Sequence, residues 1–209
     1  MSVNFDRNLL PKCFRKLEQV KEALYHLRNA NYLHEFSDAW SRYLTASGGV
    51  IHAVEGGAQI SPQGRQWYGG IRRRDRADAL CIYFLQARNE EEHGRNAVAG
   101  YNPLPGIGVI NPETQQLEPF VSWDPDTIEV ASDGSMTGRQ LRENKGWKIG
   151  IGSIPVGPIL TSIRDSKFGN IFPPPIEHRG RRISNKSPVY LAEIYCIYLE
   201  SLVQEAANL

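Results

Sequence analysis

The sequence predicts a mainly α-helical protein, a four-helix bundle with a β-rich insertion between its third and last helices. Three observations support this fold class. Apolar residues recur at steps of three and four residues near both ends of the chain. Of the 13 prolines, 10 lie between residues 100 and 187, together with 11 of the 19 glycines. The same stretch holds short β-branched and aromatic runs, so we expect helices in 1–99 and 188–209 and the insertion in 100–187.

The first two predicted helices lie within residues 10–57, and each carries an apolar stripe. Pro11 marks the start of the first, since proline is favoured at the first helical position. The first stripe consists of Leu10, Phe14, Leu17, Val20, Leu24 and Leu27. The second consists of Leu33, Phe36, Trp40, Tyr43, Ser47, Val50, Ile51 and Val54. The short connection at 29–32 predicts antiparallel neighbours, and Gly48-Gly49 is where we expect the second helix to kink or break.

The third predicted helix begins between residues 61 and 72 and ends at Gly94, a residue type favoured just beyond helix C-termini. Its stripe consists of Ala77, Leu80, Cys81, Phe84 and Leu85. The last helix follows Ser187-Pro188, which supply an N-cap and a first-turn proline. Its stripe consists of Leu191, Ile194, Tyr195, Tyr198, Leu202 and Val203. Because no helix buries its stripe alone, the four are expected to pack as a bundle.

The predicted insertion consists of short strands connected by long loops. The candidate strands are 108–110, 120–123, 127–130, 148–151 and 159–163. Asp133-Gly134 is a turn signal between two of them, and Pro173-Pro174-Pro175 forms a stiff connector before the last helix.

The composition limits the classes of function. With 209 residues, 41% of them hydrophobic and 22% charged, the chain is long enough to bury a core. Wholesale disorder, collagen-like repeats and coiled coils are therefore excluded. The 24 Lys and Arg nearly balance the 23 Asp and Glu, so a nucleic acid would have to be bound by a local basic patch.

Neither a membrane segment nor a bound metal is expected. No stretch of 18 apolar residues occurs and Met1–Asp6 does not resemble a signal peptide, which predicts a cytoplasmic protein without membrane attachment. Cys13, Cys81 and Cys196 lie far apart, each within an apolar helical pattern, and no Cys-x-x-Cys pair occurs. We expect buried, reduced thiols, and we predict neither a metal nor a cofactor.

The segment from Arg88 to His93 carries the strongest candidate chemistry. A histidine can take the proton from a ribose 2′-hydroxyl while a guanidinium stabilises the charge that builds up on the attacked phosphate. RNA then supplies its own nucleophile without a metal, and cleavage leaves a 2′,3′-cyclic phosphate and a 5′-hydroxyl. Arg88 also continues the apolar stripe four residues after Phe84, where a guanidinium is costly unless it is paired or lines a cleft.

Other interpretations of this spacing remain open. Arg28 and His34 also fit Arg-x(4–6)-His, but they flank the turn between the first two helices instead of ending an apolar-striped helix. The segment 88–93 can also be a helix-end salt-bridge cluster with a cation near the C-terminal dipole. A di-iron site built on Glu90-x-x-His93 is a further alternative, but it needs a second Glu-x-x-His, which the sequence lacks.

The run Ala87–Gly94, at the end of the third of four helices, resembles the motif of the HEPN (higher eukaryotes and prokaryotes nucleotide-binding) family. That motif is Arg-x(4–6)-His with a polar residue, often Asn, after the arginine. The resemblance covers residues 10–99 and 188–207. It implies a HEPN-like bundle and a metal-independent endoribonuclease of a toxin or defence type. It also implies that Arg88 and His93 are catalytic and that Asn89 orients groups or contacts phosphate.

The resemblance further implies a homodimer in which two Arg/His motifs face each other across one cleft. RNA would be the substrate, and an antitoxin or another protein a candidate partner. Helix geometry is consistent with a dimer, because residues five apart lie about 140° apart around the axis and about 7.5 Å along it. Arg88 and His93 of one chain are therefore poorly placed to hold the same phosphate.

Two basic clusters are candidates for binding the RNA backbone. The first, near the start of the third helix, is Arg72, Arg73, Arg74 and Arg76. The second, before the last helix, is Arg179, Arg181 and Arg182 with Lys186. Both are alternatively solvated surface, and His178 is expected in a loop. The aromatic residues that are candidates for base stacking, or else for the core, are Trp67, Tyr68, Trp123 and Trp147.

Three functions remain open from the sequence. The favoured one is a metal-independent endoribonuclease with His93 as general base or acid and Arg88 as phosphate stabiliser. The second is a catalytically inactive HEPN-type module that binds a nucleotide or a protein through the same cleft. The third is an interaction protein whose insertion carries an exposed apolar patch.

Overall fold

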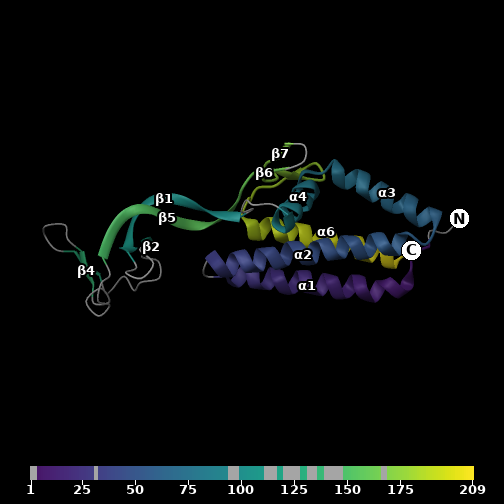
Figure 1. Cartoon of the computed structure of the whole chain (residues 1–209), viewed down its shortest axis with the longest axis horizontal. Coiled ribbons are helices and arrows are strands. Elements are labelled where there is room, and N and C mark those ends of the chain that lie inside the picture. Colours follow the sequence, from purple (N-terminus) through teal and green to yellow (C-terminus); the bar gives the residue numbers. More distant parts are fainter. Residues whose placement is uncertain are drawn as a thin grey trace. The chain divides into compact units, whose positions relative to one another are not determined.

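The structure is a computed structural model, and it forms two compact units (Figure 1). It describes residues 4–30, 33–93, 99–110, 117–119, 128–130, 136–138, 148–165 and 169–209. Side chains are described for residues 4–30, 34–92, 158–165 and 169–209. One unit consists of Met1–Gly100 and Pro158–Leu209, and the other of Tyr101–Gly157.

The first unit is mainly helical, as the sequence predicts. Its helices are the 3₁₀ helix η1 (Arg7–Leu9) and the α-helices α1 (Leu10–Asn29), α2 (Leu33–Ala58), α3 (Pro62–Arg76), α4 (Ala79–His93) and α6 (Pro188–Ala207). Pro11 and Pro188 occupy the first turns of α1 and α6, and the Ser187 hydroxyl accepts a hydrogen bond from the backbone N–H of Tyr190. None of the helices in the described ranges is both long enough and apolar enough to cross a membrane.

The single third helix predicted from the sequence is wrong, because the structure has two helices there, α3 and α4. Ala77 caps the C-terminus of α3 by donating to the carbonyls of Arg74 and Asp75. Asp78 then caps the N-terminus of α4, since its side chain accepts from the backbone N–H of Cys81 at 2.9 Å. The two caps stop one helix and start the next within two residues.

Helices α1, α2, α4 and α6 belong to the same unit (Figure 1) and share a core. This core is rich in aromatic residues. Phe84 of α4 stacks on Tyr195 of α6, with ring centroids 4.3 Å apart. The same phenyl ring contacts Trp40 and Tyr43 of α2. Burial of each such side chain contributes about 1.5–3 kcal/mol, so this cluster fixes α4 against its neighbours.

Helix α2 runs unbroken from Leu33 to Ala58, so the break expected at Gly48-Gly49 does not occur. The two glycines instead let side chains of other helices pass close to the α2 backbone. A Cβ at position 48 would lie 2.7 Å from Cδ of Arg88, and a Cβ at position 49 would lie 3.0 Å from Cδ of Lys16. Close packing therefore explains glycine at these positions.

Residues 158–187, which the sequence analysis places in the insertion, group with the helices. This segment contains the short strands β6 (Ile163–Arg164), β7 (Ile171–Phe172), β8 (Glu177–His178) and β9 (Arg181–Arg182). Strands β6 and β7 pair antiparallel, as do β8 and β9. Ile163 and Ile183 are buried in the helical core, which ties both hairpins to it.

The strands that contribute to the second unit are β1 (Ala99–Ile110), β2 (Leu117–Pro119), β3 (Ile128–Val130), β4 (Met136–Gly138) and β5 (Lys148–Leu160). Strands β2, β1 and β5 form a sheet in that order, and β3 pairs antiparallel with β4. The candidate strand at 120–123, with Trp123, lies outside the described residues, as do Trp147 and Gly94.

Candidate functional site

Arg88 lies in the last turns of α4, and its side chain is held at three points. Its aliphatic part crosses the α2 backbone at Gly48. Its guanidinium binds Glu92 through two contacts, Nη2 to Oε2 at 2.8 Å and Nε to Oε1 at 3.0 Å. Only 22% of the Arg88 side chain is exposed. The planar guanidinium therefore has a defined orientation, which a solvated surface arginine lacks.

The three glutamates of α4 that follow Asn89 differ in their surroundings. Glu90 is buried, Glu91 is exposed, and Glu92 turns toward the guanidinium. Asn89 is exposed. Glu92 forms an ion pair with Arg88, and a phosphate that binds this guanidinium has to compete with that carboxylate.

His93 is the last residue of α4, five positions after Arg88. Its side chain lies outside the described residues, so the structure gives no distance between the imidazole and the guanidinium. The other Arg-x(4–6)-His match is engaged elsewhere, because Arg28 donates to Glu193 of α6 at 2.8 Å.

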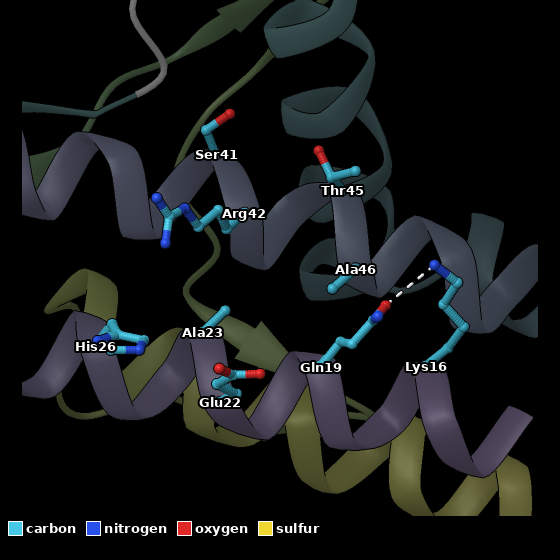
Figure 2. Close-up of a pocket in the computed structure, with 9 residues that line it drawn as sticks. All are labelled: Lys16, Gln19, Glu22, Ala23, His26, Ser41, Arg42, Thr45 and Ala46. Carbon is cyan, nitrogen blue, oxygen red and sulfur yellow. Dashed lines mark hydrogen bonds between the residues drawn. The ribbon is translucent and has the colours of Figure 1, made fainter.

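A groove lies between α1 and α2 (Figure 2). Small buried alanines, Ala23 and Ala46, leave room for it. Lys16 occupies one end of the groove, where its amine donates to Gln19 at 3.0 Å and its stem covers Gly49. The other residues that line the groove are Glu22, His26, Ser41, Arg42 and Thr45.

The opposite end of α4 brings together residues that are distant in the sequence. The carboxylate of Asp78, which caps α4, accepts from the backbone N–H of Arg179 at 2.7 Å. Its other oxygen lies 3.0 Å from Nδ1 of His178. His178 belongs to strand β8, so the expectation that it lies in a loop is wrong. The β8–β9 hairpin is therefore attached to the junction between α3 and α4.

A second carboxylate at the same junction binds α6. Tyr198 donates its hydroxyl to Asp75 at 2.6 Å. The guanidinium of Arg179 lies over the Tyr198 ring, 5.1 Å from its centroid, in a cation–π contact. The His178 ring meets the same tyrosine edge-on, at 6.2 Å. One tyrosine thus connects α3, α6 and the hairpin.

The pKa values of the two carboxylates are shifted in opposite directions. Burial raises the pKa of Asp75 and outweighs the hydrogen bond from Tyr198 and the nearby arginines. Burial also acts to raise the pKa of Asp78, but hydrogen bonds from Cys81, Arg179 and His178 outweigh it and lower the pKa. Asp78 is therefore the firmly ionised member of the pair.

Asp78, Cys81 and His178 each bring one potential metal ligand atom within 4.8 Å of the others. Zn²⁺ accepts this set of donors, but it binds cysteine as the thiolate. Burial, together with the charges of Asp75 and Asp78, raises the pKa of the Cys81 thiol. The hydrogen bonds given above account for Asp78 and His178, so we assign these two groups to capping α4 and holding the hairpin.

The junction also brings the two basic clusters together. Their arginines are all exposed: Arg72, Arg73, Arg74, Arg76, Arg179, Arg181 and Arg182. We call these seven residues the arginine face. Arg74 and Arg179 line a common pocket of about 390 Å³ between the end of α3 and the hairpin. The two clusters therefore meet at Arg74 and Arg179, although about 100 residues separate them in the sequence.

The two aromatic residues of α3 that are candidates for base stacking already contact other parts of the protein. Tyr68 is buried in the core, and Trp67 is half-buried and donates its indole N–H to Glu205 at 2.9 Å. Sequence reasoning did not identify Asp78 or Tyr198 as site residues. Aspartate before an apolar helix is a cap signal, but nothing local in the sequence indicates its contact with His178.

Comparison with known proteins gave no match: no family model matches the sequence, and no curated protein or solved structure matches it significantly. The function proposed below therefore rests on the motif and on the geometry of the two ends of α4.

Proposed function

We propose that the protein is a metal-independent endoribonuclease of the HEPN type. His93 takes the proton from a ribose 2′-hydroxyl, and O2′ attacks the adjacent phosphorus. The P–O5′ bond breaks, O5′ takes a proton from a protonated His93 or from water, and the product ends are a 2′,3′-cyclic phosphate and a 5′-hydroxyl. Arg88 stabilises the additional negative charge on the phosphate oxygens, and Asn89 orients the phosphate.

The observation that carries the proposal is the position of Arg88 over Gly48. Glycine inside a helix costs about 0.5–1 kcal/mol relative to alanine, and any Cβ at position 48 would lie 2.7 Å from the arginine stem. Glycine is therefore present where Arg88 crosses α2, although it lowers the stability of the helix. A guanidinium fixed before substrate arrives stabilises developing charge without reorganising during the reaction.

The packing of α4 one turn before Arg88 also supports a catalytic role for this arginine. Phe84, four residues before Arg88, is fixed by Tyr195 of α6 and by Trp40 and Tyr43 of α2. These contacts set the rotation and the axial position of α4, and with them the place of Arg88. A catalytic arginine requires this kind of support from the residues around it.

We further propose that the active form is a homodimer in the cytoplasm with a toxin or defence role. Two copies of the motif, facing each other, would let His93 of one chain and Arg88 of the other act on one phosphate. An antitoxin or another protein partner would restrain such an enzyme.

A second candidate function is a catalytically inactive HEPN-type module that binds a nucleotide or a protein. The observation that favours it is the bidentate pair between Arg88 and Glu92, which occupies the guanidinium within the chain. Such a module binds phosphate ligands when Glu92 is displaced, but it leaves RNA intact.

The test is cleavage of a mixed-sequence RNA by the full-length protein in excess EDTA. We expect the wild type to cleave and His93→Ala to lose at least about 100-fold in rate. His26→Ala is the matched control, because His26 is exposed on α1, which carries neither Arg88 nor Gly48, and it should cleave like the wild type. An intact RNA with the wild type, or equal rates for both variants, would favour the inactive module.

A further inference from the structure

The arginine face carries positive charge that the described part of the chain does not neutralise. Arg72 and Arg74 form long ion pairs, at 3.5 Å to Glu55 and 3.8 Å to Glu205, and such exposed pairs are weak. Within the described ranges, no carboxylate lies within 4.0 Å of a guanidinium nitrogen of the other arginines of the face. The face is therefore able to bind anions from solution.

Three carboxylates lie beside these arginines, because Asp75, Asp78 and Glu177 line the same pocket as Arg74 and Arg179. Asp78 is occupied by the backbone N–H groups of Cys81 and Arg179, and Asp75 accepts the Tyr198 hydroxyl. Both carboxylates thus serve internal hydrogen bonds that hold the hairpin and α6 in place. The seven arginines of the face outnumber the three carboxylates of this pocket, so a positive charge remains.

Arg179 is the most fixed arginine of the face. It has φ +49°, a left-handed conformation that a residue with a Cβ rarely adopts, and Gly180 follows with φ +73°. The N–H of Arg179 is bound by Asp78, and its guanidinium rests on the Tyr198 ring. Positive φ at two consecutive residues is what the two-residue turn of a tight hairpin requires, so the connection between β8 and β9 fixes the backbone of Arg179.

We infer that the arginine face binds the phosphate backbone of single-stranded RNA, with Arg179 stacking against an unpaired base. That the polyanion is RNA rests on the proposed function. Single strands expose base faces, which stack on guanidinium planes, whereas a duplex hides them. Tyr198 already covers one face of the Arg179 guanidinium, and the residue is exposed, so a base can cover the other.

The position of the face suits a substrate anchor for the proposed site. Asp78 caps one end of α4, and Arg88 lies ten residues further along the same helix, about 15 Å along its axis. At about 3.4 Å per stacked nucleotide, four to five nucleotides span that length. The face would therefore hold the strand a few nucleotides away from the bond that is cut.

The test measures binding with RNA that cannot be cleaved. A fluorescently labelled single-stranded RNA with 2′-O-methyl riboses is titrated with the full-length protein in EDTA, and anisotropy is recorded over a range of salt concentrations. The variants are R73A/R76A and R181A/R182A, each of which removes two cations of the face. Lys12→Ala/Arg15→Ala is the matched control, since it removes two exposed cations of α1.

Each double variant of the face should weaken binding about 25-fold at about 0.1 M salt and reduce the log–log salt slope by about 1.4. The α1 control should lose less than about threefold. Arg179→Ala should weaken binding about tenfold, more for the single strand than for the same sequence as a duplex.

Wild-type affinity in the face variants, or an equal loss in the α1 control, would overturn the inference. Equal affinity for the duplex would also overturn it, as would competition by poly-aspartate as strong as that by RNA. Failure of the nuclease proposal gives a different result, because the uncleavable RNA then binds through the face while ordinary RNA stays intact. Cleavage of ordinary RNA with unchanged binding by the face variants would instead contradict only the inference.

Discussion

The two ends of α4 are built in different ways. At its first turn, α4 is joined by Asp78 to a hairpin that lies 100 positions away in the sequence. At its last turns, the contact that defines the site is between Arg88 and Glu92, four positions apart, with Gly48 beneath it. Contacts between distant segments of the chain form the first end of α4, whereas contacts within α4 itself form most of the second.

The charged groups at the two ends of α4 have different physical roles. The carboxylate at the first turn is 9% exposed and satisfies several donors, so its removal should affect folding. The guanidinium at the last turns is more exposed and has a carboxylate neighbour on its own helix, so its removal should affect chemistry more than stability. The predictions below test this separation, from the largest expected effect to the smallest.

Arg88→Lys should reduce the rate of RNA cleavage by about 100-fold or more, because lysine keeps the charge but lacks the planar fork that contacts two phosphate oxygens. The free energy of unfolding should fall by less than about 1 kcal/mol. Single-turnover cleavage and urea unfolding measure the two quantities. A large loss of stability without a loss of rate would reverse the roles of the two ends.

Asp78→Ala should lower the free energy of unfolding by about 2–3 kcal/mol, since it removes the cap of α4 and the acceptor that holds the hairpin. Urea unfolding monitored by circular dichroism measures the change. Asp38→Ala is the control, because Asp38 is exposed on α2, and its effect should stay within about 0.5 kcal/mol. Similar effects for both variants would show that the hairpin is not held through Asp78.

Gly69→Ala should stabilise the protein by about 0.5–1 kcal/mol, since nothing lies within 4 Å of a Cβ at that position in α3. Gly48→Ala should bring no such gain, because its Cβ would displace Arg88, and RNA cleavage should fall. Thermal unfolding and the cleavage assay compare the pair. Equal stabilisation with unchanged cleavage would mean that the position of Arg88 over Gly48 has no functional importance.

The pH dependence should differ between the two carboxylates of the junction. The pKa of Asp78 lies below its ordinary value of 3.8, so its stabilising contribution is present above that pH and is lost as the pH falls through the lowered pKa. The pKa of Asp75 is raised, so its contribution is present below 3.8 and is lost as the pH rises through the raised pKa.

Asp78→Asn should therefore cost stability near neutral pH and little at strongly acidic pH. Asp75→Asn should be neutral or slightly stabilising near neutral pH, within about 1 kcal/mol, because it removes a buried charge and keeps an acceptor for Tyr198. Urea midpoints at the two pH values measure both effects. The same pH trend for both variants would contradict the opposite pKa shifts.

The sequence predicts the local features of this protein and misses the features that depend on distant contacts. Most residues of the helical stripes, the prolines that begin α1 and α6, and the position of Arg88 late in α4 follow from spacing alone. Phe14 and Leu85, which the predicted stripes include, are exposed in the structure. The boundary between α3 and α4 was missed because the apolar pattern continues across it, although Asp78 is a residue type that favours caps.

Two other features depend on contacts between segments that are far apart in the sequence. Gly48 looks like a helix breaker in the sequence, and only the position of Arg88 shows why glycine occurs there. The sequence places the two arginine clusters in separate segments, and only the contact of Asp78 with the hairpin joins them. The arrangement of the Arg88 and His93 side chains depends on groups beyond one helix, which residue spacing does not specify.

The central claim is that the last turns of α4 cut RNA without a metal, and the ends of the products test it most directly. The full-length protein is incubated with RNA in EDTA, and the new termini are identified by mass spectrometry. The account predicts a 2′,3′-cyclic phosphate, or its hydrolysis product, and a 5′-hydroxyl, which disappear when the ribose 2′-hydroxyls are methylated. Products with a 3′-hydroxyl and a 5′-phosphate, or cleavage of the methylated RNA, would contradict it.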